Sequence, residues 1–212
     1  MRVTKFTQSC LRLENGDAVL VVDPGAFSER AALTGADAVL ITHEHIDHLD
    51  MDAVSDAVAK WPEMRIYAHR DVLPKLTAVE GRVTTVDVGQ EFEAAGFSVR
   101  AYGGQHAIIY SEIPQIANLG FLIADHETSV YTPGDSFTVP QDAQVDTLFV
   151  PLNAPWMKLA EAIDFARAVK PRRAYALHDA LINDLGASIA DAHLTNFSGT
   201  EYAHLAPGTV ID

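Results

Sequence analysis

The sequence is poor in cysteine and in long apolar runs, and each shortage excludes a class of protein. Its 212 residues include a single cysteine, Cys10, so no internal disulfide can form and a disulfide-stabilised scaffold is excluded. No stretch approaches the roughly 20 apolar residues of a membrane-spanning helix. The segment Met1–Glu14 holds three basic residues and no apolar run of signal-peptide length. We therefore expect a cytoplasmic protein.

Positive charge is scarce as well. The chain has 15 Lys and Arg residues against 29 Asp and Glu residues, a formal net charge of −14 at pH 7. Such a surface repels the phosphates of nucleic acids and of anionic membranes, so we expect neither as a partner. A small-molecule substrate remains the expected partner, and the sequence leaves open whether the chain forms a homo-oligomer. Divalent cations bound in a cleft would reverse the sign of the charge locally.

The chain contains many short apolar runs, as expected for an α/β protein. Hydrophobic residues make up 48% of the sequence, and a chain of this length can bury a large core, so we expect one domain over residues 1–212. Ten runs rich in Val and Ile predict strands: Asp17–Val22, Ala38–Ile41, Arg65–Tyr67, Arg82–Val86, Phe97–Tyr102, Leu119–Ile123, Thr128–Tyr131, Thr147–Val150, Ala174–Ala176 and Glu201–Leu205.

Two segments have apolar residues at helical spacing. Met51–Lys60 is followed by Trp61-Pro62, and Lys158–Val169 is followed by Pro171, so a proline ends each predicted helix. Strands dominate the first third of the chain, and helices alternate with strands after it. This order favours a sandwich in which helices cover the sheets over a simple parallel βαβ repeat.

The segment Thr42–His48 concentrates groups that bind metal ions. Within six residues it holds His43, His45, Asp47 and His48, after a predicted strand and before a predicted helix. Imidazole nitrogens and carboxylate oxygens suit zinc, iron or manganese. Side chains alternate along an extended segment, so His43 and His45 reach the same ion. Asp47 and His48 lie one step further, in reach of a second ion.

This segment resembles the His-x-His-x-Asp-His signature of the metallo-β-lactamase-fold hydrolases. The other motifs of that family follow in order: Asp23 after an early strand, His106 after Gly103-Gly104-Gln105, Asp135 in a Gly134-Asp135 turn, and His178 after a late strand. The resemblance implies a four-layer αββα sandwich with a metal cleft at one edge. Five motifs in the same order make it specific.

The resemblance also assigns a role to each of these residues. It implies that His43, His45 and His106 hold one metal ion, that Asp47, His48 and His178 hold a second, and that Asp135 bridges both. Asp23 resembles the carboxylate that in this family orients a ligand histidine through its other ring N–H. The expected cofactors are therefore two divalent ions, zinc first, with manganese or iron as alternatives.

The same resemblance narrows the function. His45 stands where flavin-linked di-iron reductases have Glu, and Asp135 stands where common zinc β-lactamases have Cys. The 34 residues after His178 are too few for the C-terminal helical region of glyoxalase-II-like thioesterases. Asn118-Leu119-Gly120-Phe121 and Pro133-Gly134-Asp135-Ser136 resemble a compact branch that includes ascorbate-6-phosphate lactonase-like proteins.

The expected activity is metal-dependent hydrolysis of a small-molecule ester, lactone or phosphodiester. A hydroxide bridging two ions would be the nucleophile, and Asp47 or Asp135 would orient it and pass on its proton. The alternative is a metal-binding member of the fold without turnover, such as a sensor. The segments Pro151–Met157 and Ile108–Pro114 are candidate walls of the substrate site.

Several further residues receive ordinary structural interpretations. Asp179, next to His178, is expected to cap a helix, with a proton-shuttling role as the alternative. Cys10 is expected to be a small buried apolar group. The histidines outside the pattern are expected to be surface or packing residues: His69, His126, His193 and His204.

Overall fold

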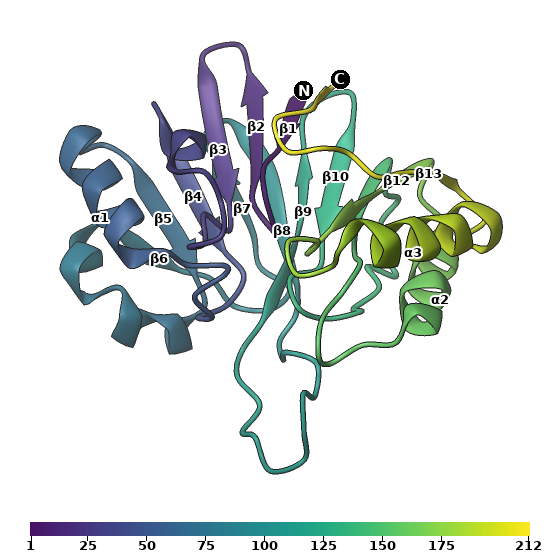
Figure 1. Ribbon diagram of the computed structural model, residues 1–212. Coiled ribbons are helices and arrows are strands. Elements are labelled where there is room, and N and C mark those ends of the chain that lie inside the picture. Colours follow the sequence, from purple (N-terminus) through teal and green to yellow (C-terminus); the bar gives the residue numbers. More distant parts are fainter.

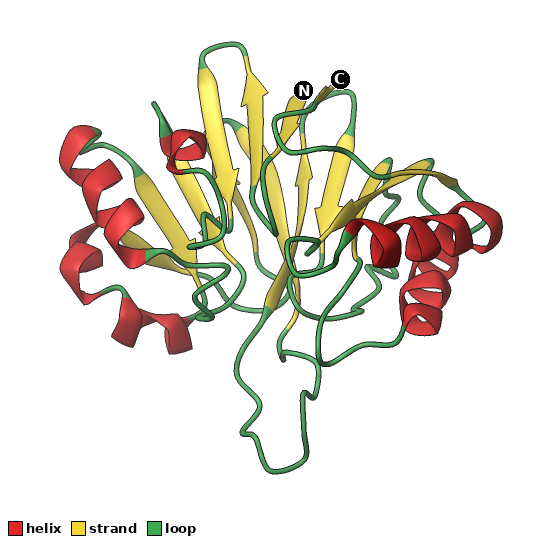
Figure 2. Cartoon of the chain, viewed as in Figure 1, coloured by secondary structure: helices red, strands yellow, loops and turns green.

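A computed structural model describes residues 1–212 as two sheets packed face to face with helices on both outer faces (Figures 1 and 2). Each sheet has seven strands. The helices gather at the two sides of the molecule, and the sheets lie between them. The expected αββα sandwich is therefore confirmed.

The first sheet is formed by the N-terminal half of the chain and its last strand. Its order is β14-β1-β2-β3-β4-β5-β6, antiparallel up to β3 and parallel from β3 to β6. Its strands are β1 (Arg2–Lys5), β2 (Leu11–Asn15), β3 (Ala18–Val22), β4 (Ala38–Ile41), β5 (Arg65–Ala68), β6 (Val83–Thr85) and β14 (Val210–Ile211). Its outer face is covered by the 3-10 helices η1 (Arg30–Leu33), η2 (Arg70–Lys75) and η3 (Thr77–Arg82) and by α1 (Met51–Lys60).

The second sheet has a similar plan. Its order is β13-β12-β11-β10-β9-β8-β7, antiparallel from β7 to β10 and parallel from β10 to β13. Its strands are β7 (Glu91–Ala94), β8 (Phe97–Gly103), β9 (Leu119–Ala124), β10 (Ser129–Thr132), β11 (Thr147–Pro151), β12 (Arg173–Leu177) and β13 (Glu201–Ala203), and α2 (Leu159–Val169) and α3 (Asp184–Phe197) cover it.

The apolar residues form three layers because the central strands are buried on both faces. Along β3, Leu20 and Val22 point into the core between the sheets, where they meet Phe121 of the second sheet. Val19 and Val21 point to the other face and pack under the helices of the first sheet. Burial on both faces explains why these strands are continuous apolar runs rather than alternating ones.

Most predicted elements lie within a residue or two of the observed ones. The helix Met51–Lys60 has the predicted bounds, and the Asp50 carboxylate caps it by accepting a hydrogen bond from the Ala53 N–H at 3.0 Å. The strands β1, β2, β7 and β14 were not predicted, and of these β7 and β14 lie at sheet edges. Helix α3 was not predicted either. It has 14 residues and lies in the segment after His178. None of the three α-helices has the length and hydropathy that a membrane crossing requires.

Candidate metal centre

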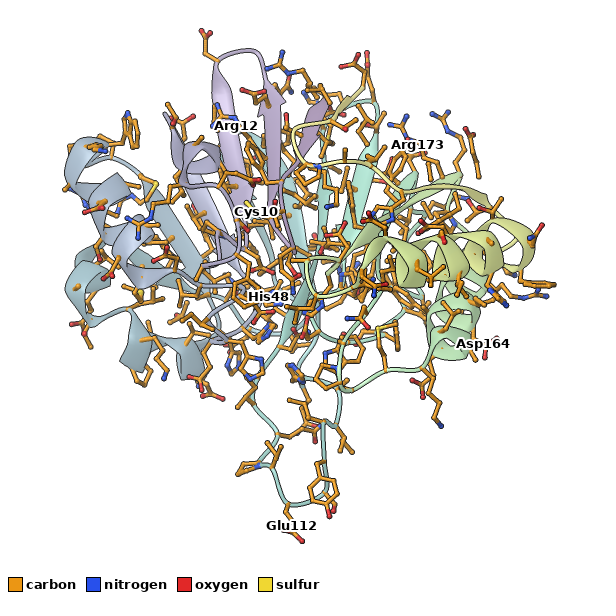
Figure 3. All side chains as sticks on the ribbon, in the orientation of Figure 1. Cys10, Arg12, His48, Glu112, Asp164 and Arg173 are labelled. Atoms are coloured by element: carbon orange, nitrogen blue, oxygen red, sulfur yellow. The ribbon has the colours of Figure 1, made fainter.

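The seven candidate ligands meet at one edge of the sandwich, where strands of both sheets end. The loop between β4 and α1 carries four of them, and single residues follow β8, β10 and β12. Figure 3 places His48 near the middle of the molecule, between the two halves. Taking one nitrogen or oxygen atom from each residue, the seven residues form two compact groups. Within each group these atoms lie within 4.8 Å of one another. One group is His43, His45, His106 and Asp135, and the other is Asp47, His48 and His178.

Asp135 lies between the two groups. Its Oδ1 atom is 3.0 Å from Nε2 of His48, and its Oδ2 atom is 3.3 Å from Nε2 of His106 and 3.4 Å from Nε2 of His178. The second group closes through Asp47, whose Oδ2 atom is 3.2 Å from Nε2 of His178. One carboxylate is thus within reach of histidines of both groups.

Partners on Nδ1 orient the histidine rings. Nδ1 of His106 lies 2.6 Å from the Ala107 carbonyl oxygen, and Nδ1 of His178 lies 2.7 Å from that of Asn153. A carbonyl oxygen only accepts, so Nδ1 of each ring must carry the proton and donate. When the ring is neutral, Nε2 keeps its lone pair, and both Nε2 atoms are buried facing the Asp135 carboxylate without a well-formed hydrogen bond. This is the tautomer that a metal-binding histidine needs.

Asp23 and Thr42 hold the rings of the signature loop. The Asp23 carboxylate accepts from the Thr42 backbone N–H at 2.8 Å and from the Thr42 hydroxyl at 2.7 Å, and its Oδ2 atom is 2.8 Å from Nδ1 of His48. Because the Thr42 hydroxyl donates to Asp23, it can accept from Nδ1 of His43, 3.0 Å away. Asp23 is thus placed to orient His48 directly and His43 through Thr42.

The charges of the cluster are strongly coupled. Burial opposes a charge on His48, but Asp135 and Asp23 outweigh it and raise the pKa of His48 well above its usual value. Burial also opposes the charge on Asp135, yet the neighbouring His48, His106 and His178 hold the pKa of Asp135 well below its usual value. Burial and the nearby His48 charge lower the pKa of His43, which keeps that ring neutral. The two buried carboxylates are therefore stabilised by positive charge close to them. Protonated His48 supplies it here, and bound cations would supply it as well.

The donor set fits divalent metal ions. Five imidazoles and two carboxylates give nitrogen and oxygen ligands of the kind that zinc, iron and manganese take. The unpartnered Nε2 atoms of His106 and His178 are costly in a buried cluster unless something binds them. Residues within the two groups thus have the chemistry to hold divalent metal ions.

Close packing fixes the turns that carry the carboxylates. Gly25 lies so near the Asp47 carbonyl that a Cβ atom would be only 1.9 Å from its oxygen. Gly134 has φ +61°, and a Cβ atom there would be 2.3 Å from Oδ1 of Asn118. That same Oδ1 accepts from the Asp135 backbone N–H at 2.9 Å. Only glycine allows these approaches without movement of the backbone.

The structure adds three polar residues to the site that sequence reasoning missed or placed only loosely. Asn118 holds the Asp135 turn, and its side-chain amide also donates to the Pro133 carbonyl at 2.9 Å. Trp156 lies in one candidate wall and donates from Nε1 to Oδ2 of Asp135 at 2.9 Å. Gln8, which is fully buried, donates from its amide to Oδ2 of Asp47 at 3.0 Å. Asn118 was noted only within a motif, and nothing near Gln8 in the sequence pointed to a metal site.

Asp179 has a different role from the expected helix cap. The cap of α3 is Asn183, whose side chain accepts from the Gly186 N–H. Asp179 instead forms an ion pair with the buried Lys5 at 2.8 Å and lies 2.9 Å from Nε2 of His204. Asp179 therefore ties the segment after His178 to β1 of the other sheet.

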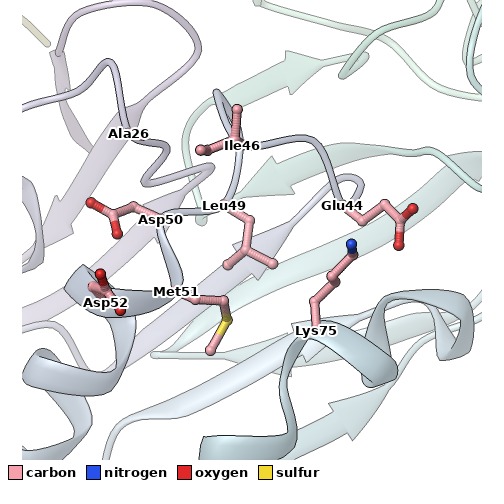
Figure 4. Close-up of a pocket in the computed structure, with 8 residues that line it drawn as sticks. All are labelled: Ala26, Glu44, Ile46, Leu49, Asp50, Met51, Asp52 and Lys75. Atoms are coloured by element: carbon pink, nitrogen blue, oxygen red, sulfur yellow. The ribbon is translucent and has the colours of Figure 1, made fainter.

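Two surface features flank the centre. A pocket of about 300 Å³ lies beside the signature loop, lined by Glu44 and Ile46 of that loop and by Lys75 across from them (Figure 4). None of the seven candidate ligands lines it. The segment after His106 forms a long loop that projects from the sandwich, with Glu112 at its tip (Figure 3).

Comparisons with known proteins agree with this fold. The model of the beta-lactamase superfamily domain matches residues 2–178. The protein Rv0786c of Mycobacterium tuberculosis is 40% identical over 206 residues, which cover 95% of each chain. A UPF0173 metal-dependent hydrolase of Dinoroseobacter shibae is 31% identical over 152 residues, which cover 64% of each chain. The metallo hydrolase Igni18 of Ignicoccus hospitalis has the same fold, with a TM-score of 0.78 at 17% identity over 99% of this chain and 97% of that chain.

Proposed function

The chain belongs to the beta-lactamase superfamily. From this premise we propose that it is a metal-dependent hydrolase, like the relative of Dinoroseobacter shibae, and that it uses two divalent ions to hydrolyse a small-molecule ester, lactone or phosphodiester. The observation that carries the proposal is the position of Asp135, within 3.4 Å of histidines of both ligand groups. A carboxylate placed in this way suits a pair of ions better than a single one.

The proposed ligand sets follow the two groups. His43, His45 and His106 would hold one ion, Asp47, His48 and His178 the other, and Asp135 would be shared. The bound ions would supply an activated water and would polarise the substrate oxygen. Zinc is the ion that we propose first, with manganese or iron as alternatives.

The protein's own residues would orient the reactants and move a proton. Asp47 is 17% exposed at its side chain and Asp135 is 4% exposed, so Asp47 is better placed to take a proton from the attacking water and return it to solvent. The hydrogen bond from Gln8 to Oδ2 of Asp47 fixes that carboxylate. The indole N–H of Trp156 does the same for Asp135.

A three-substrate panel tests the proposal. Protein loaded with zinc or manganese, and protein treated with a chelator, are assayed on γ-butyrolactone, p-nitrophenyl acetate and bis(p-nitrophenyl) phosphate. We expect the loaded protein to hydrolyse at least one of them, the chelated protein none, and His45→Ala to lose the activity. His126→Ala is the matched control, because His126 lies outside both ligand groups, and it should retain the activity.

The panel also decides between the proposal and its alternative. If protein that holds two equivalents of metal hydrolyses none of the three bonds, the non-catalytic member of the fold becomes the better interpretation. If the bond cleaved is the lactone, the proposed kinship with ascorbate-6-phosphate lactonase-like proteins gains support.

A further inference from the structure

The loop Ala107–Ile116 exposes apolar side chains beside the candidate metal centre. It begins directly after His106 and projects from the end of the sandwich, between β8 and β9 (Figures 1 and 3). Ile108 is 65% exposed, Tyr110 58% and Ile113 50%. Several large apolar groups exposed on one loop are costly in water, and such patches mark surfaces that bind a ligand or a partner.

A recess connects this loop to the candidate ligands. His45 and His106 line one part of it, and Ile108, Ile109, Ile113 and Ile116 of the loop line the rest. Its volume is about 20 Å³, enough for a group the size of a methyl. A wider hollow of about 550 Å³ is formed by the same loop and shares Ile108, Ile113, Pro114 and Gln115 with the recess. Ser111 and Glu112 also line the wider hollow, so the apolar surface that extends outward from the candidate ligand histidines is the part formed by Ile108, Ile113 and Pro114.

The lining of the recess carries no charged carboxylate, ammonium or guanidinium group. Apart from the two histidines, its residues are apolar, with Gln115 as the single amide. A phosphate or carboxylate on the substrate would find no Lys or Arg here, and the whole chain has a net charge of −14. The lining therefore favours an uncharged, apolar group over an anionic one.

We propose that the loop Ala107–Ile116 binds the apolar acyl chain of a neutral ester or lactone. The inference rests on the proposed function, since it places the reacting carbonyl at the ligand histidines and the chain along Ile108 and Ile113. Each methylene buried against the loop strengthens binding about fourfold. A substrate with a medium-length chain is therefore preferred over one with a short chain.

The test compares two esters and a matched pair of variants. The ratio of kcat/KM for p-nitrophenyl octanoate to that for p-nitrophenyl acetate is measured on metal-loaded protein. In the wild type we expect a ratio of at least about 50, corrected for the intrinsic reactivity of the two esters. The double variant I108S/I113S should lower this ratio at least tenfold. Ile189→Ser, at a 52% exposed position on α3, should leave it unchanged.

Binding of the free acids gives a second readout that does not need turnover. By calorimetry, octanoate should bind the loaded protein at least tenfold more tightly than acetate, and I108S/I113S should remove the difference. Equal binding of the two acids, or an unchanged ester ratio in I108S/I113S, would overturn the inference. The inference would also be overturned if the wild type were a dimer and I108S/I113S a monomer with an unchanged ester ratio. The loop would then bind a second copy of the chain. If the loaded protein hydrolyses neither ester and no substrate of the three-substrate panel, but octanoate still binds more tightly, the proposed function fails and the loop assignment stands.

Discussion

The side-chain amide of Gln8 donates a hydrogen bond to Oδ2 of Asp47 at 3.0 Å, although 39 positions separate the two residues. The same side chain accepts a hydrogen bond from the Ala180 N–H at 2.9 Å, and the Gln8 carbonyl accepts one from the His178 N–H at 3.1 Å. Asp47 and His178 belong to the same ligand group but come from the loops of different sheets. Gln8 therefore joins the two halves of that group.

Gln8→Ala is expected to weaken the binding of one metal ion more than that of the other. It removes the hydrogen bonds to Asp47 and Ala180, and loss of such a supporting contact weakens metal affinity about 10- to 100-fold. Competition with a chromophoric chelator measures the affinity of each ion. Gln141→Ala, at an exposed position, is the control. Wild-type affinity for both ions in Gln8→Ala would show that Gln8 does not position this group.

This contact also shows how far sequence reasoning reaches. The signature loop was recognised because its four polar residues lie within six positions and share one chemistry. Gln8 has no such neighbours, and its part in the site depends on a left-handed backbone at φ +64° and on packing between the sheets. Asn118 and Trp156 likewise act on Asp135 through contacts across 17 and 21 positions. Local pattern finds the candidate ligands, which the structure brings together, more readily than it finds the residues that position them.

The same limit applies to the fold. The central strands and α1 have strong apolar patterns and were predicted. Helix α3 was missed because only Ala190 and Leu194 of it are buried, while Leu185, Ile189 and Phe197 are exposed. Its apolar residues therefore do not lie on one face, and the helical period is hidden.

The two sides of α3 should respond differently to truncation. Leu194 is fully buried against the second sheet, so Leu194→Ala should lower the free energy of unfolding by about 2–5 kcal/mol. Leu185 is 70% exposed, and Leu185→Ala should change it by less than about 0.5 kcal/mol. Urea denaturation measures both. Similar losses in the two variants would contradict the packing of α3 described above.

His204 should make stability depend on pH. Its Nε2 and Nδ1 atoms each lie 2.9 Å from a carboxylate oxygen, of Asp179 and Asp191, and these hydrogen bonds raise its pKa above the usual value. Lys5 is the other charge that contacts Asp179. A raised pKa stabilises the fold below the unfolded value of about 6.5, and this contribution is lost as pH rises through the folded pKa.

The substitution His204→Gln isolates this contribution. Its cost in unfolding free energy, measured with urea, should be larger at pH 6 than at pH 9. Taking the difference between variant and wild type at each pH removes effects common to both proteins. An equal cost at the two pH values would mean that His204 does not gain its proton more readily in the folded state.

Cys10 should be unreactive in the folded protein. It is fully buried, and burial followed by the charges of Asp23 and Glu29 raises the pKa of its thiol far above the usual range. The thiolate that reacts with disulfide reagents is therefore both scarce and inaccessible. We expect Ellman's reagent at pH 8 to detect one thiol per chain in denaturant and almost none without it. Rapid reaction of the folded protein would contradict this burial.

The metal content of Asp135→Asn tests the central claim most directly. The substitution keeps the shape of the side chain but removes the negative charge shared by the two ligand groups, so repulsion between two ions would no longer be offset. Elemental analysis after incubation with zinc should give close to two equivalents per chain for the wild type and for His126→Ala, and one or fewer for Asp135→Asn. Two equivalents in Asp135→Asn, or a wild type that stays free of metal, would contradict a two-ion centre joined by this carboxylate.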